Sequence, residues 1–145
     1  MTRLSRRTVL GAPLAALPLP AAAEEDFVAA ERAILAGRGP AEGGIVLDIP
    51  PLSENGNSVD LSVRVDSPMT AEDHVTAIHI LSEKNPFPRV ATFTLTPRAG
   101  RAEVATRIRL ATTQTILALA ETSRGTVHRA SREVIVVLGA CVETG

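Results

Sequence analysis

Apolar and polar residues alternate strictly between Ser58 and Asp66. The apolar positions are Val59, Leu61, Val63 and Val65, and the polar positions are Asp60, Ser62, Arg64 and Asp66. Because successive side chains of a strand point to opposite faces, this period of two predicts a strand with one buried and one solvated face.

Further short apolar runs follow along the chain, separated by turn-forming residues such as Asn55-Gly56 and Ser123-Arg124-Gly125. The runs are Ile45–Ile49, Val75–Ser82, Ala91–Thr96, Val104–Leu110, Thr115–Ala120 and Val134–Leu138. The last two are apolar on both faces, which predicts central strands between covering layers. About seven short strands without helical crossovers predict an all-β fold, an immunoglobulin-like antiparallel β-sandwich.

Residues 24–36 have a different period and predict a short amphipathic helix. The residues near one helix face are Phe27, Ala30, Ile34 and Leu35. Acidic residues at the start suit the positive end of the helix dipole, and Gly37 follows the last turn, where glycine commonly ends a helix. We therefore expect a short N-terminal helix before the sandwich.

Residues 1–23 have the composition of an export signal that is removed from the mature protein. Ser5-Arg6-Arg7-Thr8-Val9-Leu10 is a twin-arginine motif, and Ala21-Ala22-Ala23 offers small residues for cleavage. The apolar run between them contains prolines and is too short to span a bilayer. We therefore expect a periplasmic protein exported by the twin-arginine route, without a membrane anchor. An ordinary secretion signal with two arginines is the alternative.

The composition of the mature chain narrows the classes of partner. The signal holds three arginines and no acidic residue, so 12 basic residues stand against 16 acidic residues and the mature net charge is −4. The chain has no Trp or Tyr and only three Phe, so platforms for stacking bases are missing. Nucleic acid is not an expected partner, because such binding depends on basic groups that neutralise phosphates.

The histidines do not form a catalytic or metal-binding pattern. His74 and His79 are five residues apart and face opposite sides of one extended strand, and His128 falls in an expected hairpin loop. The sequence shows no zinc-ligand spacing, nucleophile elbow or phosphate-binding glycine loop. It therefore predicts no catalytic residue, no metal site and no intrinsic cofactor, and a role other than that of an independent enzyme.

Arg107 and Arg109 flank Ile108, so both side chains leave the same face of an expected strand. Two guanidinium groups on one face could hold an oxyanion such as sulfate. The alternative is a solvated strand face that Glu103 or Glu121 balances.

The chain contains a single cysteine, Cys141, close to its end. In an oxidising compartment a lone thiol pairs with another molecule, stays buried or does chemistry. Gly139 follows the last apolar run, and residues 139–145 hold little apolar surface, which predicts a flexible C-terminal arm after a domain formed by residues 24–138. The three residues beyond Leu138 allow the thiol to reach out by roughly 10 Å.

The charges near Cys141 do not activate its thiol. Glu143 and the terminal carboxylate are negative, and the last dozen residues hold no Lys, Arg or His. Negative charge disfavours the thiolate, so we expect a thiol that is sluggish alone and reactive only inside the electropositive site of another protein. Such a thiol suits a carrier arm better than an enzyme nucleophile.

Several segments together resemble SoxY, the sulfur-carrier subunit of the periplasmic thiosulfate-oxidising Sox system. They are Glu54-Asn55-Gly56-Asn57-Ser58-Val59, Asp66-Ser67-Pro68-Met69-Thr70, Ile78-His79-Ile80, Lys84-Asn85-Pro86, Pro97-Arg98-Ala99-Gly100 and Thr106-Arg107-Ile108-Arg109-Leu110-Ala111. The resemblance covers essentially the whole mature chain. It implies an immunoglobulin-like sandwich that pairs with a second sandwich subunit, SoxZ, and carries sulfur species covalently on Cys141 during thiosulfate oxidation.

The same resemblance implies partners that visit the arm. They are a c-type cytochrome complex that couples thiosulfate to the thiol, a dimanganese hydrolase that releases sulfate, and a sulfur dehydrogenase for the remaining sulfane sulfur. The arm departs from the family's Gly-Gly-Cys-Gly-Gly ending, because Ala140, Val142 and Glu143 stand where glycines are usual. Either the cognate enzymes have wider pockets, or the chain is a paralogue with altered partners. The competing functions are a module whose odd cysteine only crosslinks two copies, and a weak hydrolase or binding protein.

Overall fold

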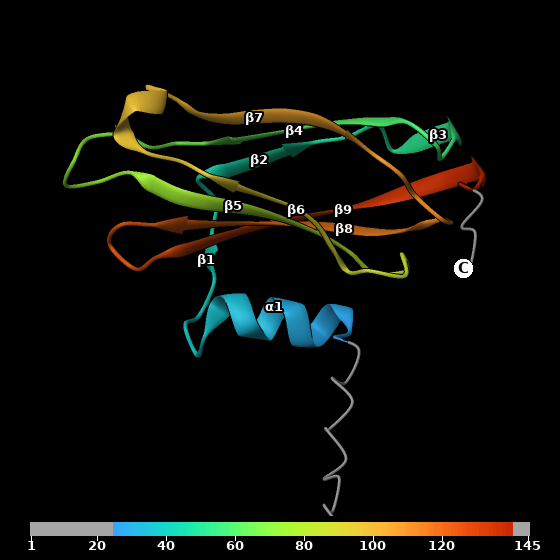
Figure 1. Cartoon of the computed structure of the whole chain (residues 1–145), viewed down its shortest axis with the longest axis horizontal. Helices are drawn as coiled ribbons and strands as arrows, with labels where there is room; N and C mark the ends of the chain where they lie inside the picture. Colours follow the sequence, from blue (N-terminus) through green and yellow to red (C-terminus); the bar gives the residue numbers. More distant parts are fainter. Residues whose placement is uncertain (1–24, 141–145) are drawn as a thin grey trace, which may run out of the picture.

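The computed structural model describes residues 25–140, so the predicted signal and residues 141–145, including Cys141, lie outside the described residues. One helix and nine strands form a two-layered β-sandwich (Figure 1). They are α1 (Phe27–Leu35), β1 (Ala41–Glu42), β2 (Ile45–Asp48), β3 (Leu52–Asn55), β4 (Val59–Val65), β5 (Val75–Ser82), β6 (Arg89–Thr94), β7 (Ala102–Ile108), β8 (Gln114–Thr122) and β9 (Val127–Leu138). A short 3₁₀ helix, η1 (Pro97–Ala99), precedes β7. The predicted all-β immunoglobulin-like sandwich is confirmed.

The larger sheet has the strand order β1-β9-β8-β5-β6, and β3 also pairs with β9. The smaller sheet has the order β2-β4-β7, with antiparallel pairing throughout. Strands β1 and β3 pair with β9 in parallel, whereas all other neighbours in the larger sheet run antiparallel. Strand β9 therefore pairs with three other strands and leads to Gly139 and Ala140, the residues before Cys141.

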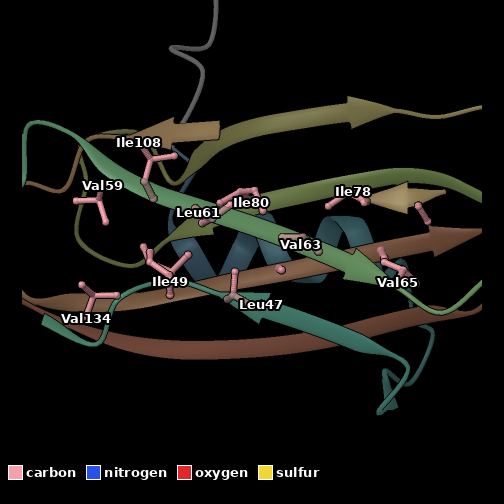
Figure 2. Packing of buried hydrophobic residues seen from close by; sticks show 14 of the residues in the cluster. Leu47, Ile49, Val59, Leu61, Val63, Val65, Ile78, Ile80, Ile108 and Val134 are labelled. Atoms are coloured by element: carbon pink, nitrogen blue, oxygen red, sulfur yellow. The ribbon is translucent and has the colours of Figure 1, made fainter. Parts of the chain in front are cut away.

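The main core lies between the two sheets and follows the predicted alternation. In β4 the apolar residues Val59, Leu61, Val63 and Val65 are buried, while Asp60 and Arg64 are exposed. These four side chains and those of Ile78 and Ile80 from β5 belong to one apolar cluster, which Figure 2 shows in the space between the strands. The period of two is thus the direct cause of the sandwich, because each strand presents one apolar row to the opposite sheet.

Helix α1 covers part of the outer face of the larger sheet (Figure 1). Ala30 and Ile34 are buried in a second apolar cluster with Leu117 and Leu119 of β8. The side chain of Asp26 accepts a 2.7 Å hydrogen bond from the backbone N–H of Ala29 and begins the helix. The predicted helix is confirmed, with bounds a few residues shorter than expected.

The predicted covering of both faces holds for β8 but is wrong for the end of β9. Residues 116–120 of β8 are all buried, because α1 covers one face and the smaller sheet covers the other. On β9, Val134 and Val136 face the core, but Ile135 and Val137 are 50% and 62% exposed. The helix packs near Val127, at the opposite end of β9, and leaves these two side chains uncovered.

Three further differences concern element boundaries. The short parallel strands β1 and β3 have no apolar period of their own and were not predicted. Strand β7 ends at Ile108 instead of Leu110, so residues 109–112 form a loop. His128 lies within β9 and not in a hairpin loop, because β9 begins at Val127.

Candidate functional site at the root of the C-terminal arm

Three segments that are distant in the sequence meet where the chain leaves the sandwich. They are the turn at residues 55–57, the loop at residues 109–112, and residues 138–140 after β9, and we call their junction the arm root. The backbone N–H of Gly56 donates to the carbonyl oxygen of Leu138 at 2.7 Å, and that of Leu110 donates to the carbonyl oxygen of Gly56 at 2.8 Å. The N–H of Ala140 then donates to the carbonyl oxygen of Leu110 at 2.9 Å. These hydrogen bonds tie Ala140, the residue before Cys141, to the body of the protein.

Two glycines allow the three segments to approach one another. A Cβ atom on Gly56 would overlap the carbonyl oxygen of Leu110, and one on Gly139 would overlap the carbonyl oxygen of Ala111. Neither glycine has the positive φ angle that favours glycine for conformational reasons. At both positions glycine is therefore required by close backbone contact.

The side chain of Asn85 holds the 109–112 loop from the outside. Its Nδ2 donates to the carbonyl oxygen of Arg109 at 2.7 Å, and its Oδ1 accepts from the backbone N–H of Ala111 at 3.0 Å. Its Oδ1 also accepts from Nε2 of Gln114 at 2.9 Å, and Gln114 in turn donates to the carbonyl oxygen of Thr112. An amide both donates and accepts, so Asn85 satisfies backbone groups of opposite polarity on the two sides of Leu110.

Buried side chains next to the 109–112 loop stabilise this hydrogen-bond network. The side chain of Leu110 is fully buried in the main core, and Gln114 is 2% exposed. The hydroxyl of Thr113 accepts a 2.9 Å hydrogen bond from the backbone N–H of Val136 and joins the loop to β9. The hydrogen bonds of Gln114 and Thr113 are partly buried, whereas the one from Asn85 to Arg109 is exposed. The partly buried bonds resist opening most, because a fully buried donor or acceptor left unpaired costs about 1–3 kcal/mol.

The structure gives Gly139 a role that differs from the predicted one. The sequence places Gly139 and Ala140 at the start of a flexible arm, whereas both lie against the 109–112 loop. Cys141, the predicted attachment point, lies outside the described residues. The predicted arm flexibility stays a prediction for the residues beyond Ala140.

The two arginines proposed as an anion contact occupy different elements. Arg107 lies on β7 opposite Asp60 of β4, and its Nε lies 2.8 Å from Asp60 Oδ1 in an exposed ion pair. Arg109 lies beyond the end of β7, in the loop of the arm root. The balancing carboxylate of Arg107 is thus Asp60 and not Glu103 or Glu121, and the anion contact stays a prediction.

Glu121 instead belongs to a network under the end of α1. Its Oε2 lies 3.0 Å from Nε2 of His79, and its Oε1 accepts a 2.7 Å hydrogen bond from Arg38. Arg38 also donates to the carbonyl oxygens of Ile34 and Leu35, so this network joins α1 to the larger sheet. Burial alone would raise the pKa of Glu121, but the hydrogen bonds from His79 and Arg38 outweigh it and lower that pKa.

The other histidines make local contacts. Nδ1 of His74 lies 3.0 Å from the carbonyl oxygen of Thr70, and Nδ1 of His128 lies 3.0 Å from that of Gly43. Between residues 25 and 140, no group of three or more His, Cys, Asp or Glu side chains could hold a metal ion. Over the same residues, no helix has the length and apolar character needed to cross a membrane.

Comparison with known families decides the membership of this chain. The model of the family described as sulfur oxidation protein SoxY matches residues 31–141, most of the chain. The chain belongs to the SoxY family. Comparison with curated protein sequences finds no match.

Solved structures agree with the SoxY family membership. The sulfur carrier protein SoxY from Chlorobium limicola f thiosulfatophilum is 33% identical, with a TM-score of 0.59, over 74% of this chain and 94% of that chain. A superoxide reductase (neelaredoxin) from Ignicoccus hospitalis, the E23A variant, is 16% identical, with a TM-score of 0.58, over 73% and 86%. A putative superoxide reductase from Thermotoga maritima is 19% identical, with a TM-score of 0.56, over 67% and 93%. The likeness to the reductases shows a shared fold alone.

The arm root contains segments by which the sequence resembles SoxY. Asn55-Gly56-Asn57, Lys84-Asn85-Pro86 and Arg109-Leu110-Ala111 belong to three separate motifs, and the fold brings them together beside residues 138–140. Reasoning from the sequence assigned no role to Gly56, Asn85 or Leu110. The available signal was an asparagine or a glycine in the first two motifs, but asparagine and glycine are common in any turn, and the third motif contains neither.

Proposed function

We propose that this SoxY-family protein carries sulfur intermediates covalently on Cys141 during thiosulfate oxidation and is not itself an enzyme. Membership in a family described as sulfur oxidation proteins supports this function, as does the similarity to a protein described as a sulfur carrier. The observation that carries the proposal is the position of the only thiol of the chain. Cys141 follows directly after Ala140, whose backbone is tied to the sandwich, and the family match extends to Cys141.

The chemistry of such a carrier needs one thiol and partners that supply the redox steps. In the first step the thiol and thiosulfate form a sulfur–sulfur bond, R–SH + S₂O₃²⁻ → R–S–S–SO₃⁻ + H⁺ + 2e⁻, and a c-type cytochrome complex accepts the electrons. In the second step water cleaves the terminal sulfur–sulfur bond, R–S–S–SO₃⁻ + H₂O → R–S–SH + SO₄²⁻ + H⁺, on a dimanganese hydrolase. A sulfur dehydrogenase then oxidises the remaining sulfane sulfur.

A carrier of this kind works best when its thiol is unreactive in transit. No positive side chain lies within the last dozen residues, and Glu143 adds a negative charge beside Cys141. A negative neighbour raises the pKa of a thiol and slows its oxidation, whereas the electropositive site of a partner enzyme would reverse that effect. The chain thus supplies the attachment point, and the partner enzymes supply the activation of the thiol.

We further propose that the carrier is one subunit of a heterodimer with a SoxZ-like protein. Uncovered apolar side chains support this pairing: Leu52 of β3 and Ile135 and Val137 of β9 are each at least half exposed. Leu52 and Ile135 are paired neighbours in the parallel β3–β9 register, so their side chains share a face of the sheet. Adjacent exposed apolar side chains of this kind favour a covering partner.

The twin-arginine motif within residues 1–23 supports a periplasmic location for the carrier. The twin-arginine motif favours export of folded protein to the periplasm, and a partner that lacks a signal would travel with the folded carrier. Replacing both Arg6 and Arg7 with lysine is expected to leave both subunits in the cytoplasm. Export of the partner alone in that variant would contradict joint export.

Intact-mass spectrometry tests the carrier function directly. The heterodimer is purified without reductant from its own cells grown on thiosulfate, beside a Cys141→Ser variant. We expect wild-type masses increased by sulfur atoms or by a thiosulfonate group, and no such additions in Cys141→Ser. A disulfide-linked dimer as the only modified species would instead support crosslinking. Undiminished thiosulfate oxidation by Cys141→Ser cells would refute the carrier function.

A further inference from the structure

We propose that Asn85 is a positioning residue for sulfur transfer, because it holds the arm root closed and so keeps Ala140, the residue before the thiol, tied to the body of the sandwich. This inference rests on the proposed carrier function of Cys141. The tether of the thiol is then counted from Ala140, two residues later than a hinge at Leu138 would place its start. A short tether keeps the thiol close to one end of the sandwich, where partner enzymes must dock.

The first step of the argument is the chain of contacts from Asn85 to Ala140. Asn85 binds the backbone of Arg109 and Ala111, the residues on either side of Leu110. Leu110 then holds both neighbouring segments, because its N–H donates to Gly56 and its carbonyl oxygen accepts from Ala140. Asn85 therefore acts on the C-terminal segment through the 109–112 loop.

The second step is steric. The carbonyl group of Ala111 lies so close to Gly139 that no side chain fits between them. An added Cβ atom would push Gly139 away from the loop and break the adjoining hydrogen bond from Ala140 to Leu110. A hinge glycine has no need of such a contact, since freedom of rotation requires open space around the backbone.

The third step gives the size of the effect. One residue separates the Cα atoms of Ala140 and Cys141 by about 3.8 Å, whereas three residues counted from Leu138 can reach up to about 10 Å. The sampled volume grows as the three-halves power of tether length, so opening the root dilutes the thiol about fivefold at a docked partner. We therefore expect the rate of sulfur loading to fall about fivefold when the root is opened.

The experiment uses two variants that open the root and two matched controls. The opening variants are Asn85→Ala and Gly139→Ala. Gly39→Ala is the glycine control, because a Cβ atom there meets nothing within 4 Å and the φ angle is not positive. Lys84→Ala is the side-chain control, because Lys84 adjoins Asn85, is exposed and lies outside the three segments of the arm root. All are made in the full chain and purified as the heterodimer with the partner subunit.

Two readouts measure the root itself. Amide hydrogen exchange at Ala140 is expected to quicken about tenfold in the opening variants, which corresponds to the loss of about one hydrogen bond. A nitroxide attached to Cys141, the only cysteine, is expected to show faster motion in the same variants. The control variants should match wild type in both measurements.

A third readout measures transfer. Wild type and one variant are mixed in a single extract of the source cells with thiosulfate, and intact masses report the loaded fraction of each. The expected initial loading ratio is about five to one in favour of wild type for each opening variant and one to one for the controls. A general loss of folding would lower the melting temperature and secondary-structure signal, whereas a positioning effect leaves both near wild type after Gly139→Ala.

Several outcomes would overturn the inference. They are equal exchange at Ala140 in wild type and Asn85→Ala, an unchanged nitroxide spectrum, or equal loading despite a loosened root. If wild type itself takes up no sulfur, the proposed function fails, and the exchange and nitroxide measurements still decide whether Asn85 holds the root. Failure of the proposed carrier function is thus distinguishable from failure of the role proposed for Asn85.

Discussion

Leu110 joins the core of the sandwich to the arm root, and its truncation tests how that root is supported. The perturbation is Leu110→Ala, with Leu138→Ala as the matched control. Both leucines belong to the arm root, but Leu110 is fully buried and Leu138 is 68% exposed. The two variants remove the same atoms from opposite environments.

The expected loss of stability follows from how deeply each leucine side chain is buried. Removing a buried leucine side chain to alanine costs about 2–5 kcal/mol, and the upper part of this range applies where the surroundings cannot collapse into the cavity. The loop around Leu110 is held by Asn85 and Gln114, so it has little freedom to collapse. We expect about 3 kcal/mol for Leu110→Ala and less than about 0.5 kcal/mol for Leu138→Ala.

The assay is urea unfolding of the isolated mature chain, followed by thermal unfolding. For a domain of this size, 3 kcal/mol corresponds to a fall in Tm of about 10 °C. Equal m-values would show that both variants unfold from comparable native states. Equal destabilisation by the two variants, or a stable Leu110→Ala protein, would refute the assignment of Leu110 to the core. Either result would also contradict the idea that the buried side chain of Leu110 supports the arm root.

Three further predictions concern other parts of the molecule. Because the pKa of Glu121 is lowered in the folded protein, its ion pair with Arg38 and its hydrogen bond with His79 stabilise the fold above the ordinary carboxyl pKa and lose this effect as the pH falls through the folded pKa. Glu121→Gln should therefore cost about 1 kcal/mol at neutral pH and nothing in acid, and a constant cost in urea unfolding at both pH values would contradict this. Val137→Ser should weaken the heterodimer in sedimentation analysis and leave the isolated chain as stable as wild type; unchanged pairing would place the partner elsewhere. Cys141→Ser should abolish sulfur loading with a Tm within about 2 °C of wild type, and a large fall in Tm would mean that the thiol is buried.

The confirmed parts of the sequence analysis depend on local periodicity. Alternation in β4 and the apolar character of β8 predicted which side chains are buried, because the period of side-chain direction belongs to a strand wherever it lies. The amphipathic helix followed from the same reasoning with a different period. The end of β9 was mispredicted, since its apolar residues identify a strand but not the length of sheet that α1 covers.

The sequence by itself determined the strands, the helix, the family resemblance and the position of the lone thiol. Only the tertiary structure decided that Asn85, Leu110 and Gly139 meet, because their contacts depend on strand order and register across long stretches of chain. From its neighbours in sequence alone, Gly139 is interpreted as a hinge before Cys141. The fold brings the carbonyl group of Ala111 against that glycine, and this contact makes it part of a fixed anchor.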